Sequence, residues 1–289
     1  MSGLLKLVPE FHPRVWGGHQ LCKGEQPIGE AWLAYGGSRI EGTRKTLSEE
    51  DSDCSLLIKI LDCHDWLSLQ VHPNDAQARQ FENQPRGKTE AWHILKAEPN
   101  AQLIAGVRSG VTFNDIQQVL PDSAVLDLVQ FHSAQSGETF FIPAGTLHAL
   151  GPGLLIYEVQ QASDTTYRVF DWDRPLAAGR SLHIDASLAV IDVGHTVVPV
   201  TQPVGNRVTL VKCPYFTLER IENTDSTDVH KRTRMEILTA IAGEIHVACG
   251  EQSCVLRPFE TVYVGEHISH YTLSGEGTVL SASVPSEER

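Results

Sequence analysis

Long apolar segments and a secretion signal are both absent from this sequence. Nowhere do 18 apolar residues follow one another, so no stretch is long enough for a transmembrane helix. Residues 1–8 carry one lysine and a very short apolar run, far below the length of a signal-peptide core. We therefore expect a cytoplasmic protein.

Paired cysteine motifs are absent as well. The six cysteines are scattered through 289 residues, and no two of them form a C-x-x-C pattern. This spacing argues against a disulfide framework and against a zinc knuckle. We expect reduced thiols that serve as small apolar core residues.

Positive charge is scarce. Acidic residues outnumber basic ones by 36 to 23, which gives a net charge of −13 at pH 7. Such a charge repels nucleic-acid backbones and anionic lipids at long range, so we expect neither as a partner. A phosphorylated metabolite would need a local cluster of Lys and Arg, and salt screens the global field beyond about 8 Å.

The sequence contains many short runs rich in Val, Ile, Leu, Phe and Tyr, bounded by Gly, Pro, Asn and Asp. This pattern predicts a mainly β protein with a few short helices. We expect helices at 74–82, with Asp75 as the cap, and at 112–120, capped by Thr112 or Asn114. The expected strands include 55–61, 66–72, 89–96, 102–107, 139–142, 154–160 and 165–171.

A linker is predicted at 197–208, which contains Pro199, Pro203 and Gly205. The chain is long enough for one large or two medium domains. We expect two, at 1–196 and 197–289. Residues 243–247 and 257–264 look like hairpin pieces of a small barrel in the second domain.

A histidine motif lies at residues 137–148, which follow the pattern G-x5-P-x-G-x2-H and end at His148. In this pattern a strand ends at a Pro-Gly turn and presents a histidine, and it resembles the second motif of the cupins, jelly rolls that hold a metal. The pair Gln70-x-His72 lies upstream, and Glu90 follows 18 residues after His72. Alternate side chains of a strand share a face, so Ser68, Gln70 and His72 point the same way.

These motifs together resemble the type I mannose-6-phosphate isomerases (phosphomannose isomerases). The resemblance is strong over about residues 11–190 and weak in the remainder. It is carried by the segments 16–18, 29–32, 56–62, 68–75, 87–90, 143–149 and 161–168.

The resemblance implies a mainly β fold of two cupin-type jelly-roll (double-stranded β-helix) barrels. It also implies the interconversion of mannose 6-phosphate and fructose 6-phosphate, with a phosphorylated hexose as the substrate. The metal would lie in the catalytic cupin domain at 1–196. In the cupin-like domain at 197–289 the same frame places Val264, Glu266 and Ser269 where the motif needs Pro, Gly and His, so we expect no metal there.

Site residues follow from the same resemblance. One Zn²⁺ would be held by Gln70, His72, Glu90 and His148, and Arg168 would lie beside the substrate as a catalytic residue. The sugar-phosphate pocket would be lined by Lys59, Ser68, Lys88 and Glu158.

The same residues make chemical sense without the family. Two imidazoles, a carboxylate and an amide oxygen suit Zn²⁺ or another divalent first-row metal. Isomerisation moves a proton between C1 and C2, and a divalent cation together with Arg168 can stabilise the enediolate that develops. The base that moves this proton is Glu158 or a histidine. Lys59, Lys88 and Ser68 offer charge and hydrogen bonds to a phosphate.

Two other functions are compatible with these motifs. One is a non-catalytic sugar-phosphate-binding cupin, and the other is an Fe(II) cupin oxygenase, which needs open coordination positions for oxygen. Gln70 as a fourth ligand and the Lys and Arg residues favour the isomerase. We expect a monomer or a small homo-oligomer. The remaining histidines, His195 among them, show no partner spacing and are expected to be structural or solvated.

Overall fold

The computed structural model describes residues 3–22, 24–174, 181–201, 204–231 and 233–285. It divides into two compact units. Unit 1 comprises Met1–His12, Ala31–Ile60 and Val200–Arg289, and unit 2 comprises Pro13–Glu30 and Leu61–Pro199. Unit 1 thus groups two N-terminal segments with the C-terminal block. The sequence predicts a single boundary between residues 196 and 197, and that division into domains stays a prediction.

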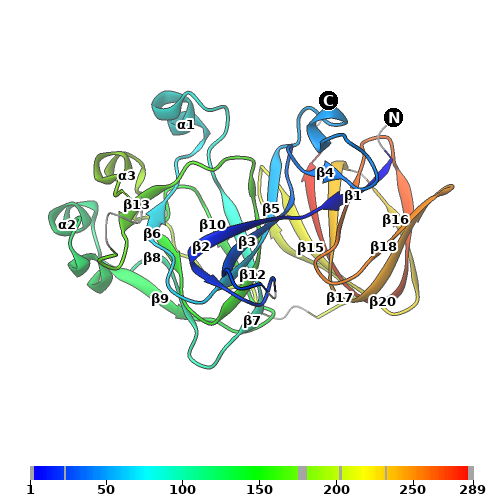
Figure 1. Ribbon diagram of the computed structural model, residues 1–289. Coiled ribbons are helices and arrows are strands. Elements are labelled where there is room, and N and C mark those ends of the chain that lie inside the picture. The colour runs from blue at the N-terminus through cyan, green and yellow to red at the C-terminus, as the bar shows by residue number, and fades with distance from the viewer. Residues whose placement is uncertain (1–2, 23, 175–180, 202–203, 232, 286–289) are drawn as a thin grey trace. The chain divides into compact units, whose positions relative to one another are not determined.

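A nine-stranded sheet forms most of unit 1 (Figure 1). Its order is β14-β15-β20-β17-β19-β1-β4, with β16 paired to β20 and β18 paired to β17. The elements are β1 (Leu4–Val8), β4 (Arg39–Ile40), the 3₁₀ helix η1 (Leu47–Glu49), β14 (Arg207–Lys212), β15 (Thr217–Asn223), β16 (Ser226–His230), β17 (Thr233–Cys249), β18 (Gln252–Leu256), β19 (Thr261–Val264) and β20 (His270–Pro285).

Two further sheets contain the strands of unit 2. The five-stranded sheet has the order β13-β6-β11-β8-β9, and the six-stranded sheet has the order β10-β7-β12-β5-β2-β3. Along the chain β2 (Glu10–Gly18), β3 (Ile28–Ala34) and β5 (Leu56–Cys63) pass from one unit into the other. The remaining strands are β6 (Leu69–Val71), β7 (Glu90–Ala97), β8 (Gln102–Val107), β9 (Val129–Ser133), β10 (Thr139–Ile142), β11 (His148–Leu150), β12 (Leu154–Gln161) and β13 (Tyr167–Phe170).

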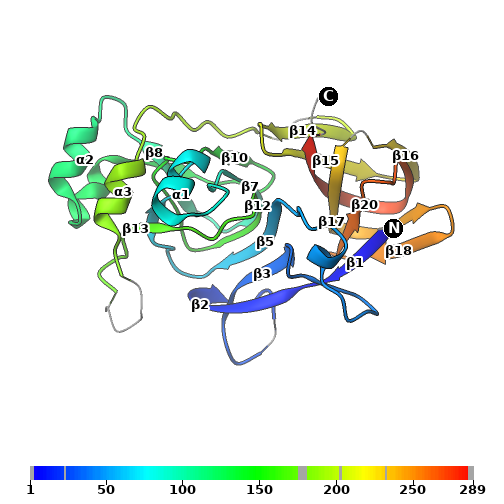
Figure 2. The same cartoon turned by 90° about the horizontal axis from the view of Figure 1, so that it is seen from above.

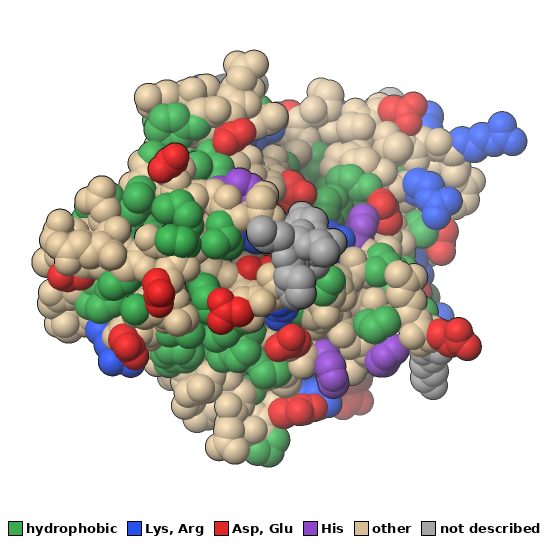
Figure 3. All heavy atoms as spheres, turned by 60° about the vertical axis from the view of Figure 1, so that its left-hand side comes forward, with side chains coloured by type: hydrophobic (Ala, Val, Ile, Leu, Met, Phe, Trp, Pro, Cys, Tyr) green, Lys and Arg blue, Asp and Glu red, His purple; other side chains and the backbone are tan. Residues whose placement is uncertain are grey.

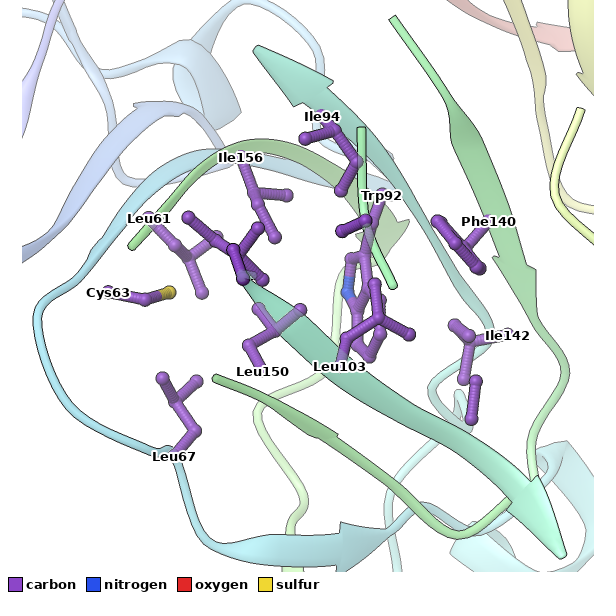
Figure 4. Close-up of a cluster of buried hydrophobic side chains, with 14 of the residues drawn as sticks. Leu61, Cys63, Leu67, Trp92, Ile94, Leu103, Phe140, Ile142, Leu150 and Ile156 are labelled. Carbon is purple, nitrogen blue, oxygen red and sulfur yellow. The ribbon is translucent and has the colours of Figure 1, made fainter. Parts of the chain in front are cut away.

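A buried apolar cluster joins the two sheets of unit 2. Trp92 of β7 and Phe140 of β10 meet Leu103 of β8 and Leu150 of β11, and the side chains point toward one another (Figure 4). All four are at most 1% exposed, and truncating such a residue to Ala costs about 2–5 kcal/mol of folding free energy. We call the sheet faces that carry this cluster the inner faces.

The inner face changes from apolar to polar along β7 and β12. Directly opposite residues of an antiparallel pair share a face. Ile156 lies opposite Ile94, then Glu158 lies opposite Trp92, and finally Gln160 lies opposite Glu90. The alternation of β7 therefore carries Glu90 to the same face as the apolar cluster, at the end of the strand.

Helices cover the outer face of the five-stranded sheet. Both views place α2 (Phe113–Val119) near β8 and α3 (Ile184–Val190) near β13 (Figures 1 and 2). Ile116 of α2 and Val190 of α3 pack with Leu69 and Val71 of β6, and the 3₁₀ helix η2 (Ser123–Asp127) contributes Val125. This packing fixes the side of β6 that faces away from the helices.

The predicted helices are both present, with one difference at a cap. Thr112 caps α2, as one of the two predicted alternatives stated. The helix α1 (Asp75–Glu82) is capped by Asn74, whose side chain accepts a hydrogen bond from the Gln77 backbone, so the prediction of Asp75 as the cap is wrong. Asp75 Oδ1 accepts hydrogen bonds from the Gly87 backbone and from the Gln161 side chain instead.

The mainly β fold with a few short helices is confirmed, whereas the arrangement as two barrels stays a prediction. None of the helices in the described ranges is long and apolar enough to span a membrane. All six cysteines lie in described segments and are free thiols. On the face shown in Figure 3 the acidic side chains are spread among uncharged and apolar ones, without one dominant acidic patch.

Candidate metal centre

Three buried side chains from three separate segments meet on the inner faces of unit 2. His72, Glu90 and His148 each offer one ligand atom, and these atoms lie within 4.8 Å of one another. The two histidine Nε2 atoms are 3.1 Å apart. Glu90 Oε1 is 3.3 Å from His148 Nε2, and Glu90 Oε2 is 3.6 Å from His72 Nε2. The three side chains are about 1% exposed.

Strand pairing and one tight turn bring these residues together. His148 lies opposite Gln70 on β6, and Gln70 precedes His72 by two residues. Glu90 lies opposite Ile142 on β10. Between β10 and β11 the chain turns at residues 143–146, where Gly145 has φ +89°, a conformation that favours glycine. The Gly145 N–H donates to the His72 carbonyl, with 2.8 Å between the atoms, so the turn binds both histidine segments.

Backbone carbonyls fix the orientation of both imidazoles. His72 Nδ1 lies 2.9 Å from the Thr165 oxygen, and His148 Nδ1 lies 2.8 Å from the Thr146 oxygen. A carbonyl only accepts hydrogen bonds, so each Nδ1 carries the proton and each Nε2 presents its lone pair. Burial lowers the pKa of His148 to about 4, which keeps this imidazole neutral near pH 7.

The donor set fits a divalent cation. Two facing nitrogen lone pairs beside a carboxylate repel one another unless a positive charge lies among them. Ligands about 2.0–2.1 Å from a tetrahedral zinc ion lie roughly 3.3 Å from each other. The separations of 3.1, 3.3 and 3.6 Å agree with this spacing.

Gln70 lies beside the group formed by His72, Glu90 and His148, which we call the group below. Its Nε2 lies 3.3 Å from His148 Nε2, while its Oε1 lies 3.5 Å from the Ser68 hydroxyl. Because the two ends of an amide are nearly isosteric, a half-turn of this group brings its oxygen to the position of the nitrogen. Gln70 and Ser68 are thus adjacent to the group, as the alternation of this segment predicts.

Lys88 also lies at the group. Its ammonium is 3.0 Å from Glu90 Oε2 and 3.1 Å from His72 Nε2, and the side chain is buried. Burial alone lowers the pKa of this lysine, but the carboxylates of Glu90 and Glu158 outweigh it and raise the pKa above its ordinary value. Lys88 therefore places a permanent positive charge beside the Glu90 carboxylate.

The two residues with predicted catalytic roles lie on the same inner faces. Arg168 of β13 is opposite Gln70 of β6, and Glu158 of β12 is opposite Trp92 of β7. Glu158 Oε2 accepts a hydrogen bond from Trp92 Nε1, with 3.0 Å between the atoms. The register thus places both residues within the set of strands that carries the three ligands.

Lys59 lies in β5 within unit 1, where its Nζ is 5.2 Å from the centre of the Trp32 ring. Its predicted contribution to a phosphate pocket stays a prediction.

Sequence reasoning missed several neighbours of the site. The carbonyls of Thr146 and Thr165 orient the imidazoles, but every residue has a carbonyl, so no sequence signal marks these two. Trp92 could have been found, because it lies two residues after Glu90 and therefore shares its face in a strand.

Comparison with known proteins agrees with this geometry. A family model for the catalytic domain of type I phosphomannose isomerase matches residues 37–101, and a model for the cupin domain of mannose-6-phosphate isomerase matches residues 206–284. A mannose-6-phosphate isomerase of Bacillus subtilis is 34% identical over 293 residues, covering 90% of each chain. The chain belongs to the mannose-6-phosphate isomerase family.

Solved structures show the same family fold. The crystal structure of the mannose 6-phosphate isomerase from Bacillus subtilis matches with a TM-score of 0.88 at 25% identity, covering 98% of this chain and 100% of the other. A zinc-bound mannose 6-phosphate isomerase matches with a TM-score of 0.76 at 18% identity, covering 99% and 100%. The second match extends the likeness of fold to a protein that holds zinc.

Proposed function

We propose that this protein is a metal-dependent aldose-ketose isomerase that interconverts mannose 6-phosphate and fructose 6-phosphate. The observation that carries this proposal is the buried group of His72, Glu90 and His148, present in a chain of the mannose-6-phosphate isomerase family. Two oriented imidazoles and a carboxylate suit one Zn²⁺, and Gln70, whose amide lies 3.3 Å from His148 Nε2, is the proposed fourth ligand through its oxygen. Other divalent first-row metals suit the same set.

The reaction moves one proton between C1 and C2 of the open-chain sugar. When bound, the divalent cation supplies positive charge that stabilises the negative charge developing on the sugar oxygens. Arg168 is proposed to add a second positive charge from the neighbouring strand, and its guanidinium stays protonated at any working pH. Proton transfer then needs one titratable group within reach of both carbons.

Glu158 is the proposed proton carrier. The two histidines of the group are less suited, because each commits its Nδ1 proton to a carbonyl and its Nε2 lone pair faces the cation position. The bond from Trp92 holds one carboxylate oxygen of Glu158 and thereby orients the other. Of the two alternatives, Glu158 or a histidine, we therefore propose Glu158.

Lys88, Ser68 and Lys59 are proposed to bind the substrate. Lys88 and Ser68 lie at the group itself, within 3.5 Å of a proposed ligand residue. They would therefore contact the sugar close to the reacting carbons. Lys59 is the proposed phosphate contact. A cytoplasmic location, a monomer or small homo-oligomer, and the absence of nucleic-acid and membrane partners also stay predictions.

A coupled assay tests the function directly. Purified protein is given mannose 6-phosphate, and formation of fructose 6-phosphate is followed before and after treatment with a chelator and after zinc is restored. We expect turnover that the chelator abolishes and zinc recovers. A matched pair, Arg168→Ala and Arg207→Ala, separates a catalytic arginine from one that pairs with Glu219 in unit 1.

The outcomes separate the isomerase from its rivals. A binding cupin would hold the sugar phosphate without converting it, and an Fe(II) oxygenase would need oxygen. Absence of chelator-sensitive conversion rejects the isomerase. In the isomerase, Arg168→Ala lowers kcat with little change in substrate binding.

A further inference from the structure

The turn at residues 143–146 supports both histidines of the metal centre. Its Gly145 N–H donates to the His72 carbonyl over 2.8 Å, and its Thr146 carbonyl accepts from His148 Nδ1 over 2.8 Å. A displacement of this turn therefore moves both Nε2 atoms. The precision of the centre depends on what holds the turn in place.

Residues 190–195, which run from the end of α3, contact this turn at two polar points. The Asp192 N–H donates to the Gly145 carbonyl, with 2.9 Å between the atoms. His195 Nδ1 lies 2.9 Å from the Thr146 hydroxyl. The first contact thus reaches Gly145, which binds the His72 carbonyl, and the second reaches Thr146, which orients His148.

Packing between the two segments is close as well. A Cβ atom added to Gly145 would lie 3.1 Å from both Asp192 Cβ and the Val190 carbonyl oxygen. This is tighter than most side-chain contacts, so a side chain at position 145 would crowd residues 190–195. The absence of a side chain at Gly145 therefore allows the turn and residues 190–195 to pack this closely.

His195 also lies near a carboxylate of its own segment. Its Nε2 lies 3.6 Å from Asp192 Oδ2, and Asp192 Oδ1 accepts a hydrogen bond from the Gly194 N–H over 2.8 Å. Nε2 of the ring faces this carboxylate, and Nδ1 on the other side faces the Thr146 hydroxyl. That hydroxyl belongs to a residue only 1% exposed.

We propose that residues 190–195 form a strap that holds the turn 143–146, and that His195 is a positioning residue for the metal centre. His195 acts on Thr146, and Thr146 acts on His148, so the effect of His195 on the proposed ligands is indirect. The inference rests on the metal-binding part of the proposed function and assigns a role to a histidine that the sequence predicts to be structural or solvated.

Metal affinity is the property that such a strap controls. Groups that orient a ligating histidine typically change metal affinity by about 10–100-fold when they are removed. We therefore expect His195→Ala and Thr146→Val each to weaken zinc binding about tenfold. His195→Asn keeps a polar atom near the position of Nδ1, and Thr146→Ser keeps the hydroxyl, so both should bind zinc nearly as the parent protein does.

The experiment measures the zinc dissociation constant by competition with a chromophoric chelator, together with kcat and KM. His132→Ala is the matched control, because His132 is a half-buried histidine that bonds a backbone carbonyl, that of Ala105, and not the turn. Circular dichroism of each metal-free protein reports folding. If His195→Ala does not fold, Thr146→Val and Thr146→Ser decide the question, because only the serine variant keeps the hydroxyl.

The results separate the strap from the proposed function. Weaker zinc binding in His195→Ala and Thr146→Val, together with nearly unchanged binding in His195→Asn and Thr146→Ser, supports the strap. Zinc binding equal to that of the parent protein in the first two variants overturns it, as does an equal loss in His132→Ala. A parent protein that binds no zinc overturns the proposed function and the strap together.

Discussion

The most informative perturbation removes the positive charge of Lys88. Its ammonium lies 3.0 Å from Glu90 Oε2 inside the protein, and both side chains are at most 5% exposed. Removing one partner of a buried ion pair costs about 3–5 kcal/mol, because the other charge stays buried without compensation. In Lys88→Met, the metal-free protein should lose about this much of its free energy of unfolding.

Zinc should reduce this loss. A divalent cation beside Glu90 compensates the same carboxylate. The substitution should therefore lower the free energy of unfolding of the zinc-loaded protein by at most half as much as that of the metal-free protein. By linkage, a difference of about 2 kcal/mol between the two forms corresponds to a roughly 30-fold tighter zinc affinity in Lys88→Met. The variant should therefore bind zinc more tightly while its turnover falls.

Urea unfolding followed by tryptophan fluorescence measures the effect, since four of the five tryptophans lie in unit 2 with the site. Lys96→Met is the matched control, because Lys96 lies in β7, is exposed and bonds the Gln20 side chain over 3.1 Å. The control should change the free energy of unfolding by no more than about 0.5 kcal/mol. Equal losses of unfolding free energy for Lys88→Met with and without zinc would show that no cation compensates the Glu90 carboxylate.

Two further predictions concern other buried groups. Trp92→Phe removes the N–H that binds Glu158 Oε2. The loss of a hydrogen bond to a charged group should lower the free energy of unfolding by about 1.5–3 kcal/mol, measured by urea titration, and should lower kcat in the coupled assay. An unchanged kcat would contradict the role of this bond. In unit 1, burial raises the pKa of Glu236 in the folded protein. Its protonated form therefore stabilises the fold fully below the ordinary carboxyl pKa, and this stabilisation is lost as the pH rises through the raised pKa of the folded state. Glu236→Gln stays uncharged and should be more stable than the parent protein at pH 8, with a difference that shrinks toward pH 4; urea unfolding at several pH values tests this, and a constant difference would contradict it.

Local patterns predicted the strands, whereas the proposed ligands followed from the resemblance to the isomerase family. The strand at 139–142 follows from its apolar residues, and the structure has β10 at Thr139–Ile142. The Pro-Gly turn and His148 follow from the resemblance to the second cupin motif. The alternation of residues 68–72 predicted the shared face of Ser68 and Gln70. The regular strand there is shorter than predicted, Leu69–Val71, because pairing partners set its ends.

Features that depend on distant partners were not predicted. The helix Ile184–Val190 has no side-chain cap bond at its N-terminus, and packing of Val190 against β6 and β13 stabilises it instead. Lys88 was predicted to line the sugar-phosphate pocket, but its direct ion pair with Glu90 depends on how the segment before β7 folds. The contact of His195 with Thr146 joins residues 49 positions apart, which no spacing rule covers.

The proposed activity depends most on a single cation held by His72, Glu90 and His148. Anomalous diffraction at the zinc edge from crystals of the zinc-loaded protein would locate it directly. We expect one strong peak in unit 2, about 2.0–2.2 Å from both histidine Nε2 atoms and a Glu90 oxygen. A zinc-loaded crystal whose anomalous peak lies away from these three side chains, or one without any peak there, would contradict it.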